Sequence, residues 1–318
     1  MTTPTHAAAR SVIGTVRGRA ARPAVALIML ATLLAAGALP ADARVVHRER
    51  SVYSTILVDR QGSVLCMQFS VRRDQRNQSC LNERRPREML FPYTRMMMTS
   101  LLLQPEPKRA LVIGLGGGTL PLALDELFPG LEQDVVEIDP AVSRVAREWF
   151  GFNPSDRVRV FEQDGRVFVK RAQVRGERYD LIMLDAFNGE YIPEHLMTRE
   201  FLAEVRELLA PGGVLAANTF SISALYDAES ATYASVFQPF LNLKPWDSGN
   251  RVILAQADAP LPDAATLTER AAQLAPRLAP YGINLEELLP LMREKQDWPA
   301  GATVLTDQYA PANLLQNQ

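Results

Sequence analysis

The sequence predicts an α/β fold in which helices cover both faces of a doubly wound, mainly parallel sheet. From residue 110 onward, short apolar runs alternate with segments that carry apolar side chains at helical spacing, which is typical of a parallel sheet with helical crossovers. The first of these runs, residues 110–113, breaks into a glycine-rich turn. Residues 44–69 instead alternate apolar and polar side chains around a turn at 60–63, which predicts a β-hairpin in a small N-terminal lead-in domain.

The glycine-rich turn predicts a site for a nucleoside. Four glycines follow the strand at 110–113: Gly114, Gly116, Gly117 and Gly118. Glycines permit a tight turn and the close approach of a ligand to the backbone. After a helix at 119–128, a second strand at 135–138 places Glu137 about twenty residues beyond the glycines, where an acid can accept hydrogen bonds from both hydroxyls of a ribose. The alternative is a purely structural turn.

The other elements follow in chain order and complete the predicted sheet. We expect the following: helix 141–150, strand 158–161, helix 167–173, strand 179–184, a helix capped by Thr198, strand 214–218, an antiparallel pair at 237–243 and 251–255, and helices after 260. Residues 92–103 form a further apolar helix whose methionines we interpret as core packing.

Three acids stand at the ends of predicted parallel strands: Glu137, Asp164 and Asp185. In open α/β sheets the carboxyl ends of the strands form the ligand site. Asp164, followed by Gly165, can accept a hydrogen bond from an adenine amino group. Asp185 ends an apolar strand, where a reacting group would lie. The alternative for each acid is a helix cap or a turn former.

Composition excludes few functions but shapes the expected location of the protein. The formal net charge of −2 over 318 residues gives no indication of nucleic-acid binding. The first 43 residues carry four arginines without an acidic partner, an apolar run at 24–39, and then Ala41-Asp42-Ala43. This order is typical of an export signal. We expect either cleavage after Ala43 or an uncleaved membrane anchor through residues 24–39, with the folded part periplasmic or anchored in the inner membrane.

Two cysteines, Cys66 and Cys80, belong to the part that we expect to be exported. In an oxidising compartment such a pair forms disulfides readily, and a Cys66–Cys80 bond would close a loop of about 15 residues. Two free buried thiols are the alternative.

Several motifs together resemble the spermidine synthase (polyamine aminopropyltransferase) family. They are Gly-Leu-Gly-Gly-Gly at 114–118, Val-Glu-Ile-Asp-Pro at 136–140, Gln-Asp-Gly at 163–165 and Tyr-Asp-Leu-Ile-Met-Leu-Asp-Ala-Phe at 179–187. Residues 191–202 and 305–311 resemble its membrane-associated, spermidine-synthase-like branch. The resemblance spans about residues 50–314.

The resemblance implies a class I S-adenosylmethionine-dependent methyltransferase-like fold with a Rossmann-like, seven-stranded sheet. It implies decarboxylated S-adenosylmethionine as donor, Asp185 as the base that deprotonates an acceptor amine, and often a homodimer. The expected organisation is a leader at 1–43, a β-hairpin lead-in domain at 44–92, a nucleoside-binding catalytic domain at 93–260 and a helical C-terminal extension at 261–318. No metal is implied.

Four positions depart from the family's pattern, and all four concern the cationic chain or the acceptor. Thr119 and Asn188 stand where the family has aspartates, Pro86 where it has a tyrosine, and Ser54 where it has a glutamine. Seven arginines at 72–95 would also repel a polyamine. We therefore expect an intact nucleoside site and a degraded polyamine acceptor site.

Two alternatives remain at this stage. The first is an S-adenosylmethionine-dependent methyltransferase, because Thr119 suits a donor that keeps its carboxylate. The second is a non-catalytic, exported module that binds a nucleoside.

Overall fold

The computed structural model describes residues 44–70, 77–187, 192–221, 225–245 and 248–310. These belong to one compact unit that begins at Ala43. The expected leader at 1–43 lies outside the described residues. Within the described part, no helix combines the length and apolar character that crossing a bilayer requires.

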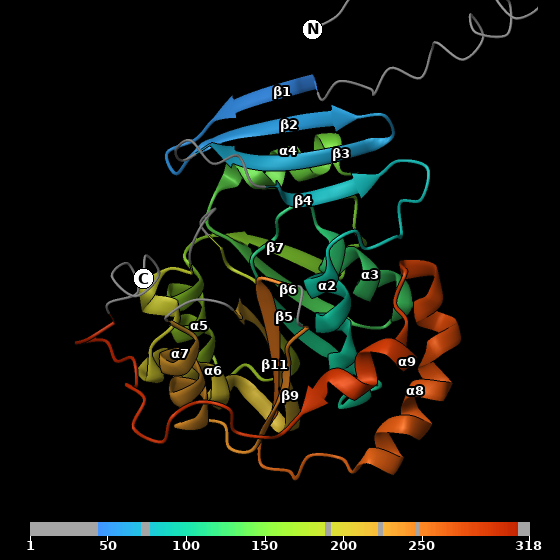
Figure 1. The fold of residues 1–318 in the computed structure, drawn as a ribbon. Coiled ribbons are helices and arrows are strands. Elements are labelled where there is room, and N and C mark those ends of the chain that lie inside the picture. Colours follow the sequence, from blue (N-terminus) through green and yellow to red (C-terminus); the bar gives the residue numbers. More distant parts are fainter. Residues whose placement is uncertain (1–43, 71–76, 188–191, 222–224, 246–247, 311–318) are drawn as a thin grey trace, which may run out of the picture. The chain divides into compact units, whose positions relative to one another are not determined.

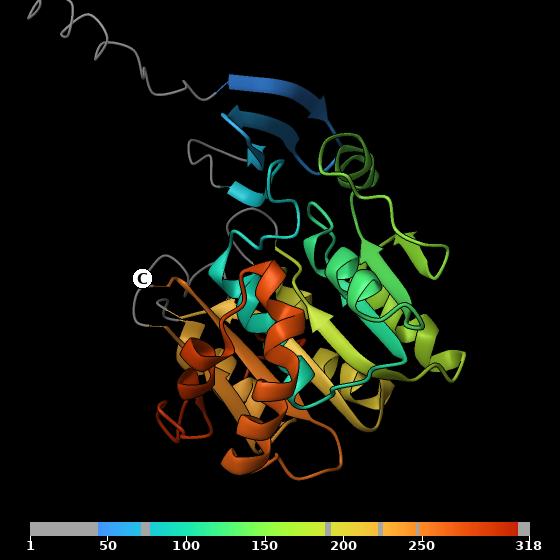
Figure 2. The same cartoon turned by 90° about the vertical axis from the view of Figure 1, so that its right-hand side faces the viewer.

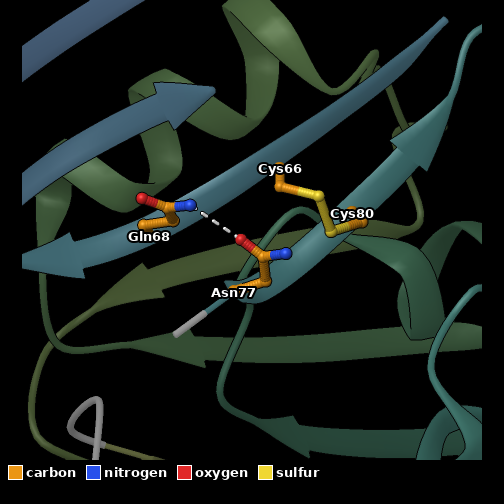
Figure 3. Close-up of a disulfide and its surroundings, with 4 residues drawn as sticks. All are labelled: Cys66, Gln68, Asn77 and Cys80. Atoms are coloured by element: carbon orange, nitrogen blue, oxygen red, sulfur yellow. Dashed lines mark hydrogen bonds between the residues drawn. A yellow bond between two sulfur atoms is a disulfide. The ribbon is translucent and has the colours of Figure 1, made fainter. Parts of the chain in front are cut away.

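A four-stranded antiparallel sheet forms the N-terminal part and confirms the predicted hairpin. Its strands are β1 (Arg44–Arg50), β2 (Thr55–Gln61), β3 (Val64–Ser70) and β4 (Asn77–Asn82), in that spatial order. The turn between β2 and β3 contains Gly62 at φ +59°, a conformation that favours glycine. Strands β3 and β4 place Cys66 directly opposite Cys80, and these two residues form a disulfide (Figure 3). The predicted disulfide is therefore confirmed.

The main sheet has eight strands in the order β12-β10-β11-β9-β8-β5-β6-β7. Their bounds are β5 (Arg109–Ile113), β6 (Glu132–Glu137), β7 (Val158–Glu162), β8 (Tyr179–Leu184), β9 (Leu209–Phe220), β10 (Phe240–Leu243), β11 (Asn250–Gln256) and β12 (Met292–Arg293). Strands β5 to β9 pair in parallel, whereas β11, β10 and β12 are each joined antiparallel to their neighbours.

The predicted count of seven strands is therefore one too low. Strand β12 is only two residues long and pairs with the otherwise free edge of β10. So short a strand has no periodicity that a sequence could reveal. The predicted antiparallel pair at 237–243 and 251–255 is confirmed as β10 and β11.

The helices alternate with the strands as predicted. Their bounds are α2 (Pro92–Met97), η1 (Met98–Leu102), α3 (Thr119–Leu127), α4 (Pro140–Trp149), α5 (Gly165–Val174), η2 (Glu194–Leu196), α6 (Arg199–Leu208), α7 (Leu225–Ala234), α8 (Ala264–Leu278), η3 (Ala279–Tyr281), α9 (Leu285–Leu288) and η4 (Leu289–Leu291). Thr198 caps α6 by accepting the backbone N–H of Phe201 at 3.2 Å, as its sequence position predicted. The C-terminal extension is helical only as far as Leu291.

Helices cover both faces of the main sheet, which confirms the doubly wound fold (Figure 1). Alternate residues of β5 show this division. Ala110 and Val112 pack with α2, η1, α3 and α8 in one buried cluster, on the side that Figure 2 turns toward the viewer. Leu111 and Ile113 pack with α5, α6 and α7 in the other. The predicted packing role of the methionines is also confirmed, because Met96, Met97 and Met98 are fully buried.

Helix α4 joins the two sheets. Its buried residues Ala141, Val142 and Val145 pack against Ile56 and Met67 of the N-terminal sheet, and Figure 1 shows α4 beside β2 and β3. Asp139 caps α4 by accepting the N–H of Ala141. The N-terminal sheet is thereby held over the carboxyl end of β6, next to the glycine-rich turn.

Candidate active site

A pocket lies at the carboxyl ends of the parallel strands, between the main sheet and the N-terminal sheet. Its floor includes Gly114 and Gly116 after β5, Glu137 at the end of β6, and Asp164 and Asp185 after β7 and β8. The predicted acids therefore meet at one edge of the sheet, as its topology requires. The N-terminal sheet contributes the opposite wall.

A β-bulge shapes that wall. Met67 pairs with Ser79 and Gln68 pairs with Asn77, so β4 carries one extra residue, Gln78, between them. Residues on a regular strand face alternate sides, yet the three consecutive residues 77–79 all line the pocket, because the bulge turns the strand. The side-chain amide of Gln68 donates to Asn77 at 2.8 Å, and the disulfide lies beside this bond (Figure 3).

The glycine turn brings β5 against Asp185. Gly114 has φ +103°, and a Cβ there would lie 2.2 Å from the backbone oxygen of Asp185. Gly118, at φ +83°, would bring a Cβ to 2.3 Å from the ring of Phe152. Gly114 and Gly116 line the pocket. A Cβ on Gly117 would lie 2.6 Å from the hydroxyl oxygen of Ser79, so Gly117 and Gly118 both pack closely against protein side chains, and their expected contact with a nucleoside stays a prediction.

Glu137 occupies the predicted place at the end of β6. One carboxylate oxygen accepts the N–H of Leu115 at 3.1 Å and the other accepts the N–H of Asp139 at 2.9 Å. Burial raises the pKa of Glu137, although these backbone bonds act in the opposite direction. The two bonds fix the carboxylate between the glycine turn and the start of α4. Each oxygen still has accepting capacity for a hydroxyl group.

Asp164 takes the helix-cap role that the sequence left open, and its contact to adenine stays a prediction. One of its oxygens caps α5 by accepting the N–H of Val167 at 2.9 Å. The other lies 2.8 Å from Nε2 of His195, which also lines the pocket. A Cβ on Gly165 would lie 2.7 Å from the side chain of Ile113, so Gly165 allows α5 to pack closely against β5.

Asp185 follows β8 and is held by two donors. The side-chain amide of Asn218 on β9 donates to it at 2.9 Å, and the hydroxyl of Tyr93 on α2 also bonds it. Burial raises the pKa of Asp185 to about 7, and the two hydrogen bonds only partly offset this effect. The pKa of Tyr93 lies well above its usual range because of burial and the charge of Asp185. Tyr93 therefore stays protonated and remains a donor.

Tyr93 is a site residue that the sequence analysis did not single out, because it lies in an apolar helix. Its hydroxyl bonds Asp185. Pro86, which stands where the family has a tyrosine, is exposed and does not line the pocket. Asn218, Asn250 and His195 were also missed as site residues, because no local pattern singles them out.

The pocket is acidic. Its described lining includes four carboxylates, those of Glu137, Asp139, Asp164 and Asp185, but neither lysine nor arginine. We expected the arginines at 72–95 to repel a polyamine, but none of those that the structure describes lines the pocket. Arg85 pairs with Glu88 and Arg87 pairs with Glu126. A pocket of this charge favours a cationic ligand.

The other departures are only partly located. Ser54 and Thr119 both line the pocket, whereas Asn188 lies outside the described residues. Within the described residues, no group of three His, Cys, Asp or Glu side chains is arranged to hold a metal ion.

Sequence comparison decides the family. A polyamine aminopropyltransferase of Vibrio vulnificus is 48% identical over 290 residues, which cover 91% of this chain and 96% of the relative. The chain belongs to the polyamine aminopropyltransferase family. A family model of the spermine/spermidine synthase domain matches residues 90–236. The resemblance inferred from the motifs is thereby confirmed, and the chain is a transferase of the aminopropyltransferase type.

Solved structures agree with the observed fold. A probable spermidine synthase from Corynebacterium glutamicum superposes with a TM-score of 0.61 at 20% identity, covering 82% of this chain and 99% of that chain. Human methyltransferase-like protein 13, solved in complex with SAH, gives a TM-score of 0.53 at 28% identity, covering 66% of this chain and 98% of that chain. The fold is therefore the methyltransferase-like α/β fold.

Proposed function

We propose that the enzyme transfers an aminopropyl group from decarboxylated S-adenosylmethionine to an amine. The observation that carries this proposal is Asp185, a partly buried carboxylate at the floor of an acidic pocket, with a pKa of about 7. A base with a pKa near the working pH combines a useful ionised fraction with a strong tendency to accept a proton. The donor and a protonated amine are both cationic, and the charge of the pocket suits them.

The proposed reaction needs one proton acceptor. Asp185 removes a proton from the ammonium group of the acceptor, which frees the nitrogen lone pair. The nitrogen then attacks the aminopropyl carbon bound to the sulfonium, the C–S bond breaks, and the bonding electrons pass to sulfur to leave neutral methylthioadenosine. Tyr93 and Asn218 hold Asp185 in place for the proton transfer. Glu137 and Asp164 are the proposed contacts to ribose and adenine.

We propose a working acceptor site rather than a degraded one. Two observations support this: the hydroxyl of Tyr93 bonds Asp185 although Pro86 stands at the family's tyrosine position, and none of the arginines that the structure describes lines the pocket. The 48% identical relative is itself named a polyamine aminopropyltransferase. Asp185 would bind the reacting nitrogen of a polyamine, and the neutral Asn188 would weaken the hold on its second ammonium.

An assay with decarboxylated donor and putrescine tests the proposal. The wild type should form spermidine and methylthioadenosine in equal amounts, and its kcat/KM should fall as the pH drops below about 7, where Asp185 becomes protonated. Asp185→Asn should lose most of this activity. Asn188→Asp should lower the KM for putrescine more than that for butylamine, which has a single amine. Full activity in Asp185→Asn would refute the general-base role.

Methyl transfer is the second candidate function. Thr119 lines the pocket without a negative charge, and a structure that binds SAH is 28% identical. Calorimetry distinguishes the two. Aminopropyl transfer predicts tighter binding of the decarboxylated donor than of S-adenosylmethionine, and the reverse order would favour methyl transfer.

We also propose that the enzyme is exported, either to the periplasm or with an anchor in the inner membrane. The basic, apolar and small-residue order of the first 43 residues supports this, and a disulfide suits an oxidising compartment. N-terminal sequencing of protein from the native host should begin at Arg44, whereas a start at Met1 or Thr2 in membranes would indicate the anchor. The homodimer implied by the resemblance stays a prediction for sedimentation analysis.

A further inference from the structure

Two asparagines extend from Asp185 in a row across the sheet. Asn218 lies on β9 and is 3% exposed. Asn250 begins the neighbouring strand β11, where it pairs with Phe220, so it sits diagonally across from Asn218 on the same face of the sheet. The side-chain amide of Asn250 donates to the side-chain oxygen of Asn218 at 3.0 Å, and the amide of Asn218 donates to Asp185 at 2.9 Å.

The chemistry of the three groups fixes the direction of this row. An ionised carboxylate can only accept hydrogen bonds, whereas an asparagine presents a donor at one end and an acceptor at the other. Asn218 must therefore turn its NH2 group toward Asp185, which leaves its oxygen facing Asn250. Asn250 must therefore donate to this oxygen from its own NH2 group. The backbone N–H of Asn250 donates to the hydroxyl of Ser248 at 3.1 Å, which helps to hold the start of β11.

We propose that Asn218 and Asn250 are positioning residues of the aminopropyl transfer: Asn250 orients the amide of Asn218, so that a donor always faces Asp185 and keeps this carboxylate ionised and fixed. The inference rests on the proposed function, because it assigns the two asparagines a role in proton transfer by Asp185. Asn250 does not contact Asp185 in this arrangement and acts through Asn218.

Groups from three other elements lie around Asp185 and Asn218, and Tyr93 is the second donor to Asp185. Tyr93 on α2 is the titratable side chain that bonds Asp185, and it stays protonated. The glycine turn after β5 meets Asp185 through backbone atoms. Glu229 on α7 lines a small cavity together with Asn218, and burial raises its pKa to about 7. Glu229 pairs with the fully buried Arg251.

The pH dependence of kcat/KM tests the proposal. Asn218→Leu removes the donor to Asp185. Asn250→Asp presents only acceptors at position 250, so Asn218 should turn its NH2 group toward that residue and its oxygen toward Asp185. Loss of a hydrogen bond to a charged group should move the acidic limb of the profile upward by about one to two pH units. Activity should recover at higher pH. Asn250→Leu should cause a smaller shift.

A double-mutant cycle separates orientation from added charge. In the Asn218→Leu background, Asn250→Asp should shift the limb much less than it does in the wild type, because the amide that it would turn is gone. Simple addition of the two shifts would overturn the proposal. Gln256→Leu is the matched control, because Gln256 lies at the other end of β11 and its amide bonds the backbone of Gly212. This control should keep the wild-type profile.

A second readout separates the proposal from the proposed function. Infrared titration of the carboxyl band that disappears in Asp185→Asn measures the pKa of Asp185 without turnover. An upward shift of this pKa in folded Asn250→Asp supports the positioning role. If Asp185→Asn keeps its activity, only the general-base assignment is refuted, and the positioning role still stands. Unshifted profiles and an unshifted infrared pKa in folded variants would overturn the positioning role.

Discussion

Replacing Asp185 with asparagine should stabilise the folded protein at alkaline pH while it removes the activity. Burial raises the pKa of Asp185 from its ordinary value of 3.8 to about 7. Below pH 3.8 the group is protonated in both the folded and the unfolded chain, so it imposes no penalty. As the pH rises toward 7, the unfolded chain ionises first, and the free energy of unfolding falls. Above pH 7 the penalty is complete.

The size of the effect follows from the two pKa values. Each pKa unit corresponds to about 1.4 kcal/mol, so a pKa of about 7 against 3.8 implies roughly 4 kcal/mol at most. Water in the pocket screens part of this, and we expect about 2 kcal/mol at pH 8. For a chain of this size such a gain raises Tm by about 3 °C. Asparagine retains an oxygen that can accept from Tyr93 and Asn218.

The assay compares thermal unfolding of the two proteins at pH 5 and pH 8 without ligand. The advantage of Asp185→Asn should be larger at pH 8 than at pH 5. Asp258→Asn is the control, because Asp258 accepts a hydrogen bond from Arg206 at 3.0 Å on the exposed surface, where such pairs contribute about 0–1 kcal/mol. If Asp185→Asn is no more stable than the wild type at pH 8, the ionised carboxylate is not penalised by burial, and the argument for a base near neutrality fails.

Three further predictions concern other parts of the chain. Replacing Cys66 and Cys80 together by serine should cost up to roughly 3 kcal/mol of stability in the chain-entropy model; reductant should lower the Tm of the wild type but not that of the variant. Glu137→Ala should weaken methylthioadenosine binding by about 1.5–3 kcal/mol in calorimetry, and unchanged affinity in a folded variant would exclude the ribose contact. Asp307→Asn should lower the free energy of unfolding by about 1 kcal/mol at neutral pH, after allowance for solvent screening. Hydrogen bonding to Arg166 lowers the pKa of Asp307 to about 2, so the variant should be as stable as the wild type below about pH 2. An equal loss at all pH values would contradict this electrostatic origin.

Local patterns were sufficient for the fold and for part of the site. The apolar strand at 110–113, its glycines and Glu137 lie within one βαβ unit, so their spacing alone predicts where they meet. Asp164 and Asp185 were predictable as well, because each stands just after a predicted strand and parallel strands end at one edge of the sheet. Cys66 and Cys80 are separated by only 14 residues, and the pairing of β3 with β4 places them opposite each other, so their spacing and the expected export made the disulfide predictable as well.

The partners of Asp185 depended on tertiary structure. Tyr93 lies in an apolar helix before the sheet, and Asn218 and Asn250 lie on strands whose order in the sheet does not follow the chain. Tyr93 meets Asp185 because α2 packs against this face of the sheet, and Asn250 meets Asn218 because β11 pairs with β9. The bulge of β4 was equally hidden, since it arises from the register between two strands. Contacts of this kind depend on packing between distant segments, and a periodic pattern reports only which face of its own segment is buried.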